Sequence, residues 1–298
     1  MADPLQNKVI VITGASSGFG RGAALRFAGL DTRLVLAARR AELLEEVVDE
    51  CRRAGSHALA CATDVSRREE VARLAQTAVD AFGRIDVWIN NAGVGAIGPF
   101  ERIPLDVHEQ VVRTNLLGTL YGSHWAYRQF LDQRGGVLIN IASELGFGTV
   151  PYYSSYAAAK HGVIGLSDSL RQEVKQGGID GVHICTIMPT AHDTPFFEHA
   201  ANYSGHEINP PAPLHDPDNV VEAIVRIARD PEDEEVVGGD GIVKLIAANL
   251  MPGIAEKMAA KQMHKTQMQA PPPAGDSPGA VRAPMPQGRD VSASRRKH

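Results

Sequence analysis

Cysteine, aromatic side chains and long apolar runs are all scarce in this chain of 298 residues. Its three cysteines, Cys51, Cys61 and Cys185, have no metal-like spacing and an odd count, which indicates reduced thiols in a reducing compartment. No run of about 18 or more apolar residues occurs, so the sequence predicts no membrane span. Residues 1–8 lack the positive start and apolar stretch of a signal peptide. We therefore expect a soluble, cytoplasmic protein without a metal centre.

Charge of one sign is not in large excess either. The formal net charge is −5 at pH 7, which gives no reason to expect nucleic-acid binding. Short apolar segments instead alternate with helical patterns, and the length suits one large domain. This alternation predicts an α/β fold, with a doubly wound parallel sheet of about seven strands and helices on both faces. The expected strands are Val9–Thr13, Arg33–Ala37, Ala58–Ala62, Ile85–Asn90, Gly136–Ala142, Val182–Met188 and Glu235–Val237.

The turn after the first expected strand carries three glycines. Residues 8–13 read KVIVIT, which is typical of a buried parallel strand, and Gly14, Gly18 and Gly20 follow before a helical pattern. Glycine lets the backbone approach a pyrophosphate, and a helix N-terminus offers free N–H groups and a positive dipole end. The spacing is G-x-x-x-G-x-G rather than the better-known G-x-G-x-x-G. These features predict dinucleotide binding, although a tight turn without a ligand would use the same residues.

The end of the second expected strand bears on which dinucleotide would bind. An acidic residue about twenty positions after the glycines binds the ribose hydroxyls of NAD, whereas arginine suits the 2′-phosphate of NADP. The chain has Ala38, Arg39 and Arg40 there and no acid among them. A guanidinium holds a phosphate through a planar fork of donors. We therefore expect NADP(H) in preference to NAD(H); alternatively, both arginines form the solvated start of the next helix.

Tyr156 and Lys160 lie just over one helical turn apart, so their side chains share a helix face. An ammonium beside a phenol favours the phenolate. Lowering a tyrosine pKa from about 10 by about three units takes roughly 4 kcal/mol, which a lysine and a nearby cationic cofactor ring could supply. Such a tyrosine could exchange a proton with an alcohol or a carbonyl at neutral pH. The spacing alone is weak evidence, because solvated helical pairs of this kind arise often by chance.

Together these motifs resemble those of the short-chain dehydrogenase/reductase family. TGASSGFG at residues 13–20 resembles its cofactor loop, NNAG at residues 90–93 resembles its post-strand motif, and Asp64-Val65 matches the pair that usually contacts the adenine ring. The motifs appear in the family's order and cover roughly residues 5 to 250. The positions that match its catalytic tetrad are Asn115, Ser143, Tyr156 and Lys160.

This resemblance implies a Rossmann-type fold and an NADP-dependent oxidoreductase. By family analogy Tyr156 is the general acid/base, and Ser143 orients the substrate oxygen. Lys160 would lower the pKa of Tyr156 and bond the nicotinamide ribose, and Asn115 would support a water in a proton relay. The implied cofactor contacts are Gly14, Ser16, Ser17, Gly18, Phe19, Gly20, Arg39, Arg40, Asp64, Val65, Asn91, Ala92, Gly93, Tyr156, Lys160, Pro189 and Thr194.

The loop after Val182–Met188 departs from the family pattern. The family usually has Pro-Gly followed by a valine and a threonine, whereas this chain has Pro189-Thr190, then His192, with Thr194 at the threonine position. Thr194 would contact the nicotinamide carboxamide. Threonine in place of glycine removes backbone freedom, which leaves the shape of the substrate loop open. His192 could touch the substrate, although a loop histidine is often a solvated bystander.

The residues around the expected tetrad are largely apolar, which favours an apolar carbonyl or secondary alcohol over a highly charged substrate. The same aromatic residues could equally belong to the core. Two alternatives stay open: a non-catalytic NADP(H)-binding sensor or scaffold, and a dehydratase or epimerase without net redox change. The expected substrate contacts are Ser143, Leu145, Tyr153, Tyr156, His192 and Phe196, with Phe147, Tyr152 and Phe197 completing the apolar wall.

We expect a catalytic domain over residues 1–250, which includes a substrate loop at 189–216, and then an amphipathic extension at 251–266. Residues 267–298 are rich in proline, alanine and glycine, so we expect them to be disordered. The family resemblance also implies a homodimer or homotetramer. Candidate contact helices are Val107–Leu131 and Ser155–Gln176.

Overall fold

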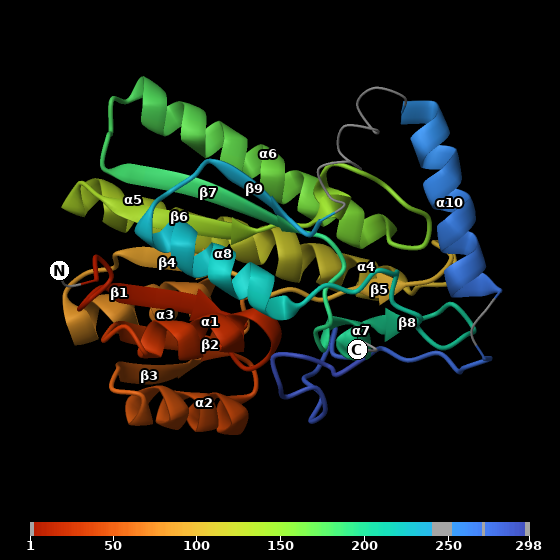
Figure 1. The fold of residues 1–298 in the computed structure, drawn as a ribbon, viewed down its shortest axis with the longest axis horizontal. Helices are drawn as coiled ribbons and strands as arrows, with labels where there is room; N and C mark the ends of the chain where they lie inside the picture. Colours follow the sequence, from red (N-terminus) through yellow and green to blue (C-terminus); the bar gives the residue numbers. More distant parts are fainter. Residues whose placement is uncertain (1–2, 240–251, 270–271, 296–298) are drawn as a thin grey trace.

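The computed structural model describes residues 3–239, 252–269 and 272–295. At its centre is a seven-stranded sheet in the order β3-β2-β1-β4-β6-β7-β9, in which neighbouring strands are parallel (Figure 1). The predicted α/β sheet is confirmed, and each strand begins and ends within about two residues of its expected position. The strands are β1 (Val9–Thr13), β2 (Arg33–Ala38), β3 (His57–Ala62), β4 (Val87–Asn90), β6 (Gly136–Ile141), β7 (Val182–Pro189) and β9 (Glu234–Val237).

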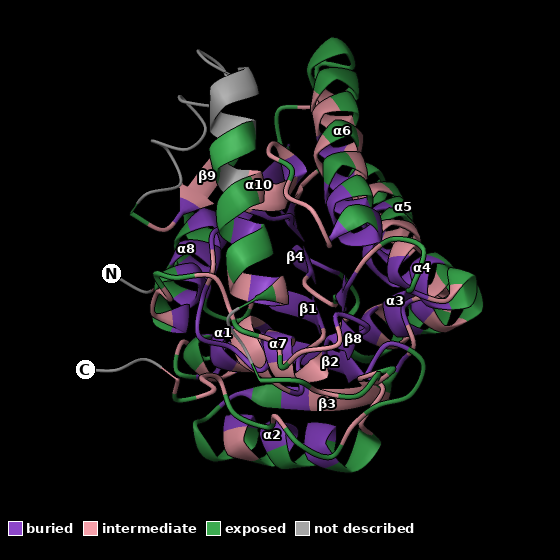
Figure 2. Ribbon diagram, turned by 90° about the vertical axis from the view of Figure 1, so that its right-hand side faces the viewer, coloured by how far each residue is buried: buried purple, intermediate pink, exposed green. Residues whose placement is uncertain are grey.

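Helices cover both faces of this sheet, and on each face a cluster of buried apolar residues lies between the sheet and its helices (Figure 2). Successive strand side chains point to opposite faces, so Ile10 and Ile12 pack under one helical layer and Val11 under the other. On the first face lie α1 (Gly18–Ala28), α2 (Ala41–Arg53) and α8 (Pro217–Arg229), and on the second lie α3 (Arg68–Phe82), α5 (Gly118–Gln133) and α6 (Ser154–Gln176). None of the helices in the described residues is both long and apolar enough to cross a bilayer.

The winding of the chain reverses between β1 and β4, which are neighbours in the sheet although β2 and β3 separate them in sequence. In an open α/β sheet the crevice outside the carboxyl ends of the strands at such a reversal is where ligands bind. The loops that follow β1, β4, β6 and β7 all leave the sheet at this edge, because the strands are parallel. The predicted motif residues are therefore brought to one side of the molecule.

Two local features were not anticipated. A small parallel pair, β5 (Ala96–Ile97) and β8 (Ala201–Asn202), connects the loop after β4 to the loop after β7. The helix expected over residues 107–131 is divided: α4 (Leu105–Val112) passes through a π-helical turn (Arg113–Leu117) into α5. Single π-turns within α-helices are frequent at functional sites.

The expected disorder of residues 267–298 does not agree with the described part of this segment. Helix α10 (Pro252–Met268) is followed by a chain that runs along the body from residue 272 to residue 295 (Figure 1). Composition predicted too little apolar surface for order, but the segment is held mainly through its backbone, whose carbonyls accept hydrogen bonds from arginine side chains of the body. Residues 240–251 and 296–298 lie outside the described residues.

Close packing of α5 on β4 depends on Gly122. A Cβ added there would lie 2.1 Å from Asn90 Oδ1 and 2.7 Å from Trp88 Nε1, two atoms joined by a buried 2.8 Å hydrogen bond. Glycine is otherwise a poor choice inside a helix, where alanine is better by roughly 1 kcal/mol. The glycine is thus explained by the approach of the two elements.

We expect Gly122→Ala to lower the free energy of unfolding by about 1–3 kcal/mol, since the added methyl overpacks a buried polar pair. Gly165→Ala on α6 is the matched control: nothing lies within 4 Å of its added Cβ, so it should stabilise the protein by about 0.5–1 kcal/mol. Urea unfolding of both variants measures the difference. Stabilisation by Gly122→Ala would contradict this packing.

Candidate active site

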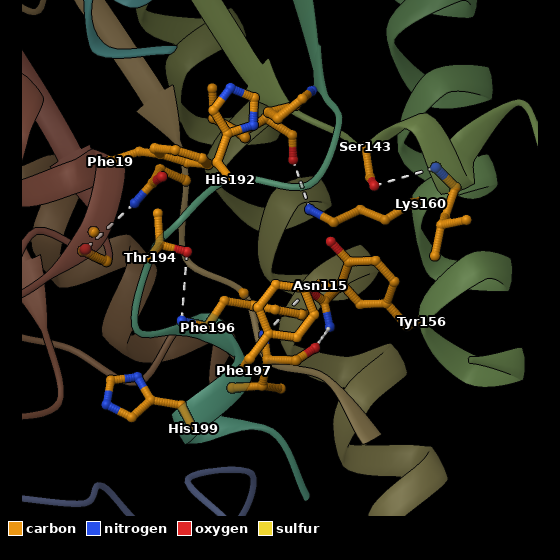
Figure 3. Close-up of a pocket in the computed structure, with 18 of the residues that line it drawn as sticks. Phe19, Asn115, Ser143, Tyr156, Lys160, His192, Thr194, Phe196, Phe197 and His199 are labelled. Atoms are coloured by element: carbon orange, nitrogen blue, oxygen red, sulfur yellow. Dashed lines mark hydrogen bonds between the residues drawn. The ribbon is translucent and has the colours of Figure 1, made fainter. Parts of the chain in front are cut away.

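The four predicted catalytic residues converge on one cavity of about 550 Å³ (Figure 3). Ser143 follows β6, Tyr156 and Lys160 project from α6, and Asn115 lies in the π-helical turn. All four are buried, although Tyr156 and Ser143 keep 9% of their surface exposed toward this cavity. The arrangement places a phenol, a hydroxyl, an ammonium and a carboxamide together at the carboxyl edge of the sheet.

Lys160 is held by the end of β6. Its Nζ donates a 2.6 Å hydrogen bond to the Ile141 carbonyl and lies 5.7 Å from the centre of the Tyr156 ring. The side chain is only 4% exposed, and this burial lowers the pKa of Lys160 to about 8. The ammonium therefore sits in an environment that disfavours its charge, and it titrates close to physiological pH.

The protein's own groups do not lower the pKa of Tyr156, and the lowering expected from Lys160 together with a cationic cofactor ring stays a prediction. Burial raises the pKa of Tyr156 to about 12, the charge of Glu144 adds to this, and only hydrogen bonding with Ser143 acts in the opposite direction. The physical reason is that the phenol is removed from water, while the ammonium of Lys160 is directed at the Ile141 carbonyl. The phenol of Tyr156 is consequently neutral across the physiological range.

Ser143 has two roles in the local structure. Its Oγ accepts a 3.2 Å hydrogen bond from the Leu145 N–H and so caps the short 3₁₀ turn Glu144–Gly146. Capping explains why a serine suits the end of β6 and fixes the direction of the hydroxyl. The same oxygen lies beside Tyr156, and Ser143 lines the cavity. The cap therefore also positions a polar group next to the Tyr156 phenol.

Asn115 shapes the π-helical turn and ties it to the loop after β4. Its Nδ2 donates 2.8 Å hydrogen bonds to the carbonyls of Val111 and Val94, and its Oδ1 accepts one from the Val94 N–H at 3.3 Å. A Cβ added to Gly93 would lie 2.8 Å from Asn115 Oδ1 and 3.9 Å from Lys160 Nζ. The carboxamide and the ammonium therefore flank the same glycine.

The floor of the cavity fits a dinucleotide. Gly14 has φ +68°, and a Cβ there would lie 2.8 Å from Ala92 Cα, while one on Gly20 would lie 2.4 Å from the Gly14 carbonyl oxygen. Only glycine allows the two loops to approach so closely. The predicted cofactor residues line this cavity, with the exception of Gly20, which supports its floor. Those along the cavity wall are Gly14, Ser16, Ser17, Gly18, Phe19, Arg39, Arg40, Asp64, Val65, Asn91, Ala92, Gly93, Pro189 and Thr194.

Arg39 and Arg40 stand at the end of this cavity away from Tyr156, where β2 joins α2. Burial lowers the pKa of both, and for Arg40 the neighbouring charges of Arg39 and Arg289 add to the effect. Neither is the freely solvated start of a helix that the sequence left as an alternative. Two partly buried guanidiniums therefore place a cluster of N–H donors and positive charge at this end of the cavity.

The opposite end of the cavity is aromatic and apolar. The Phe196 ring lies 5.3 Å from both the Tyr156 and the Phe197 rings, and Leu145 packs in the same region (Figure 3). The Tyr153 hydroxyl is buried without a hydrogen-bond partner among the residues that the structure describes, and this burial raises the pKa of Tyr153. A substrate that enters here would meet apolar walls near the reacting phenol.

His192 is not the solvated bystander that the sequence left as an alternative, because it is only 3% exposed. Its ring packs edge-on against Phe19 at 5.5 Å, and its Nδ1 is 2.9 Å from the Thr190 carbonyl oxygen. Thr194 lies beside Gly18, with 3.7 Å between its Cβ and a Cβ added to that glycine. His192 and Thr194 thus border the cofactor loop, and a substrate contact of His192 stays a prediction.

Several further residues that line the cavity were not predicted from the sequence. Met263 and Thr266 come from α10, and Ala280, Pro284 and Met285 come from the segment expected to be disordered. No motif marks them, and α10 has an incomplete apolar face among its described residues. Their placement follows only from the tertiary path of the chain.

The buried ammonium of Lys160 leads to a prediction about stability. The folded-state pKa of about 8 lies below the ordinary value of 10.5, so the charge destabilises the fold fully below about pH 8, and this cost is lost as the pH rises toward 10.5. Lys160→Met should therefore raise the free energy of unfolding at pH 6.5 by on the order of 3 kcal/mol, and the gain should shrink above pH 8.

Urea unfolding at pH 6.5, 8 and 9.5 measures this effect. Lys175→Met, an exposed lysine on the same helix, is the control and should change stability little at any of these values. A pH-independent effect of Lys160→Met, or a loss of stability at pH 6.5, would show that the buried charge of Lys160 does not destabilise the fold.

Comparison with known proteins agrees with this geometry. A family model described as short chain dehydrogenase matches residues 8–203. The uncharacterized oxidoreductase YxnA of Bacillus subtilis is 34% identical over 266 residues, which are 88% of this chain and 74% of that protein. 3β-Hydroxysteroid dehydrogenase 1 of Eggerthella lenta is also 34% identical, over 77% of this chain and 90% of that protein.

A solved structure supports the same relationship. The short-chain dehydrogenase/reductase of Burkholderia phymatum, in complex with NAD, is similar with a TM-score of 0.75 and 25% identity, over 85% of this chain and 96% of that one. The family match spans more than half of the sequence and includes the cofactor loop and the tetrad. The chain therefore belongs to the short-chain dehydrogenase/reductase family of oxidoreductases.

Proposed function

We propose that this protein is an NADP(H)-preferring oxidoreductase that interconverts a carbonyl and a secondary alcohol of an apolar small molecule. One observation carries the proposal: a single cavity joins the tetrad around Tyr156 at one end to the guanidiniums of Arg39 and Arg40 at the other. The tetrad at the first end can donate or accept a proton, and the guanidiniums at the second end suit a phosphate. Between them lies the glycine floor, along which a dinucleotide would lie.

The residues of the tetrad divide the chemistry as follows. A bound nicotinamide cofactor supplies or accepts the hydride. Tyr156, neutral at physiological pH, donates a proton to the carbonyl oxygen in the reductive direction, and Ser143 hydrogen-bonds that oxygen and orients it. Lys160 provides a positive charge next to the phenolate that forms, and it does so only while protonated, below a pKa of about 8. Asn115 holds the turn that frames Lys160.

The preference for NADP(H) rests on the end of β2. Two guanidiniums line the cavity there, and the chain has no carboxylate among residues 38–40 to accept hydrogen bonds from ribose hydroxyls. The Burkholderia phymatum relative is known in complex with NAD, so the family does not determine the choice. The proposal for this chain therefore rests on Arg39 and Arg40.

The substrate class follows from the apolar end of the cavity. Leu145, Phe196 and Phe197 offer no charge to a substrate, and the Tyr156 ring lies 5.3 Å from the Phe196 ring at a tilt of 55°. The Eggerthella lenta relative is named for a hydroxysteroid, which is an apolar alcohol. An apolar ketone or its secondary alcohol is the matching chemistry for this chain.

Tyr156→Phe tests the chemical step. The change removes only the hydroxyl, so turnover should fall by at least about a hundredfold while NADPH affinity changes little, because general acid catalysis contributes about 10²–10⁴-fold. NADPH oxidation with a panel of apolar ketones is followed at the cofactor absorbance, and titration calorimetry measures binding. Retained turnover in this variant would exclude Tyr156 as the proton donor.

The same assay separates the alternatives. A sensor or scaffold would be favoured if NADPH binds but no ketone oxidises it and no alcohol reduces NADP⁺. Product formation without net consumption of the cofactor would favour a dehydratase or an epimerase.

Arg39→Ala tests the cofactor preference. Loss of a charge-assisted hydrogen bond to the 2′-phosphate should weaken NADPH binding by about 10–100-fold and NADH binding by less than about threefold. Arg53→Ala, an exposed arginine at the end of α2, controls for the loss of a positive charge nearby. Equal weakening of both cofactors would assign Arg39 a structural role only.

A further inference from the structure

The C-terminal segment crosses the phosphate end of the cavity. Residues 276–295, hereafter the C-terminal strap, run past α7 (Phe196–His199) and β8 to the start of α1, as the dark-blue chain in Figure 1 shows. Ala280, Pro284 and Met285 of the strap line the cavity itself. The strap is thus part of the wall of the site that we propose for NADP(H).

Strap carbonyls occupy the donors of Arg40. Its Nη1 donates to the carbonyls of Met285, Gln287 and Gly288 at 3.3, 3.0 and 3.1 Å. Its Nη2 and Nε donate to the Ser16 and Ser17 hydroxyls of the glycine loop. All three nitrogens of this guanidinium are therefore engaged, and a phosphate can reach Nη1 only by displacing the strap.

Arg39 is engaged in the same way but less completely. Its Nη2 donates a 2.5 Å hydrogen bond to the Ala280 carbonyl, and its Nη1 donates to the Val281 carbonyl at 3.3 Å. The Gly18 N–H at the start of α1 donates to the Asp290 carbonyl at 3.0 Å. Two arginines and one helix N-terminal N–H, the groups that would receive the phosphates of NADP(H), are all bonded to backbone carbonyls of one segment.

We propose that the C-terminal strap is an internal competitor of the 2′-phosphate, so that NADP(H) must displace it from Arg39 and Arg40. This inference rests on the function proposed above. A phosphate carries formal charge and accepts stronger hydrogen bonds from a guanidinium than a neutral carbonyl does. The exchange thus favours the phosphate, while the strap reduces the affinity that the arginines would otherwise give.

The attachment of the strap suits reversible release. The ion pairs Arg282–Asp106, Arg289–Glu46 and Arg102–Asp276 join about half-exposed side chains, and such surface pairs contribute little. A fourth pair, Arg295–Glu198, is less exposed but lies outside the segment that contacts Arg39 and Arg40. Val281 is the principal apolar anchor: it is fully buried in a cluster with Val94 and Tyr156, whereas most residues around it are exposed. Loss of this one anchor should loosen the segment from 280 to 288.

Calorimetric titration with NADPH and NADH tests the competition. A chain that ends at Ala274, and the full-length variant Val281→Asn, should both bind NADPH at least about tenfold more tightly than the wild type, which is the effect of one net hydrogen bond to a charged group. The gain for NADH should be clearly smaller, because it lacks the 2′-phosphate. Ala283→Asn, an exposed position of the same strap, is the matched control and should bind as the wild type does.

Limited trypsin digestion of the full-length wild type gives a second measurement that requires no variant. If the 2′-phosphate displaces the strap, 2′,5′-ADP should accelerate cleavage after Arg282 and Arg289, whereas 5′-AMP should not. Protection of these bonds by 2′,5′-ADP would overturn the proposal, since it would show that the strap closes over the ligand.

The binding data distinguish a failure of the strap proposal from a failure of the proposed NADP(H) preference. If the wild type prefers NADPH and both loosened variants bind as it does, the strap proposal fails and the proposed function stands. If neither the wild type nor the chain ending at Ala274 prefers NADPH over NADH, the NADP(H) preference fails and the strap proposal fails with it.

Discussion

The junction between Thr13 and Asn91 is the constraint on which the rest of the site depends. Thr13 Oγ1 donates to the Ile89 carbonyl and accepts hydrogen bonds from the backbone N–H groups of Asn91 and Ala92, while Asn91 Nδ2 donates to the Thr13 carbonyl at 2.9 Å. These bonds fasten the carboxyl ends of β1 and β4 at the reversal of the sheet. Because the two loops are fastened there, the Gly14 backbone approaches Ala92 and the loop after β4 reaches Asn115. The floor of the cavity and the position of the tetrad follow from this one connection.

Electrostatics at the reacting end are dominated by desolvation rather than by the pairing of Tyr156 with Lys160. Burial acts on both groups in the direction that favours the neutral form. The hydrogen bond to the Ile141 carbonyl fixes the position of the Lys160 ammonium beside the Tyr156 ring. The fold therefore places a neutral phenol next to a lysine whose charge is disfavoured by burial, and the proton transfer proposed above starts from these two groups.

The sequence predicted what local pattern and order along the chain determine. Apolar strand runs gave the seven strands, and the one-turn spacing of Tyr156 and Lys160 put them on one face of α6. The features that depend on tertiary contacts could not be predicted from the sequence. The direction of the Tyr156 pKa shift depends on how completely the fold excludes water, and the π-helical turn depends on the bonds of Asn115 to Val94 and Val111. The ordered path of residues 272–295 has no side-chain pattern because its contacts are made largely by backbone carbonyls.

The order of that proline-rich segment has the same physical origin as the phosphate binding proposed for the site. Arg39 and Arg40 are partly buried, and a buried guanidinium without acceptors is costly. Backbone carbonyls of residues 280, 281, 285, 287 and 288 supply those acceptors, and they need no particular side chains to do so. A segment whose composition cannot form an apolar core can thus be ordered by the N–H donors of a neighbouring site. The two arginines organise the C-terminal segment for the same reason that they suit a phosphate: both ligands offer oxygen acceptors to a fixed fork of N–H groups.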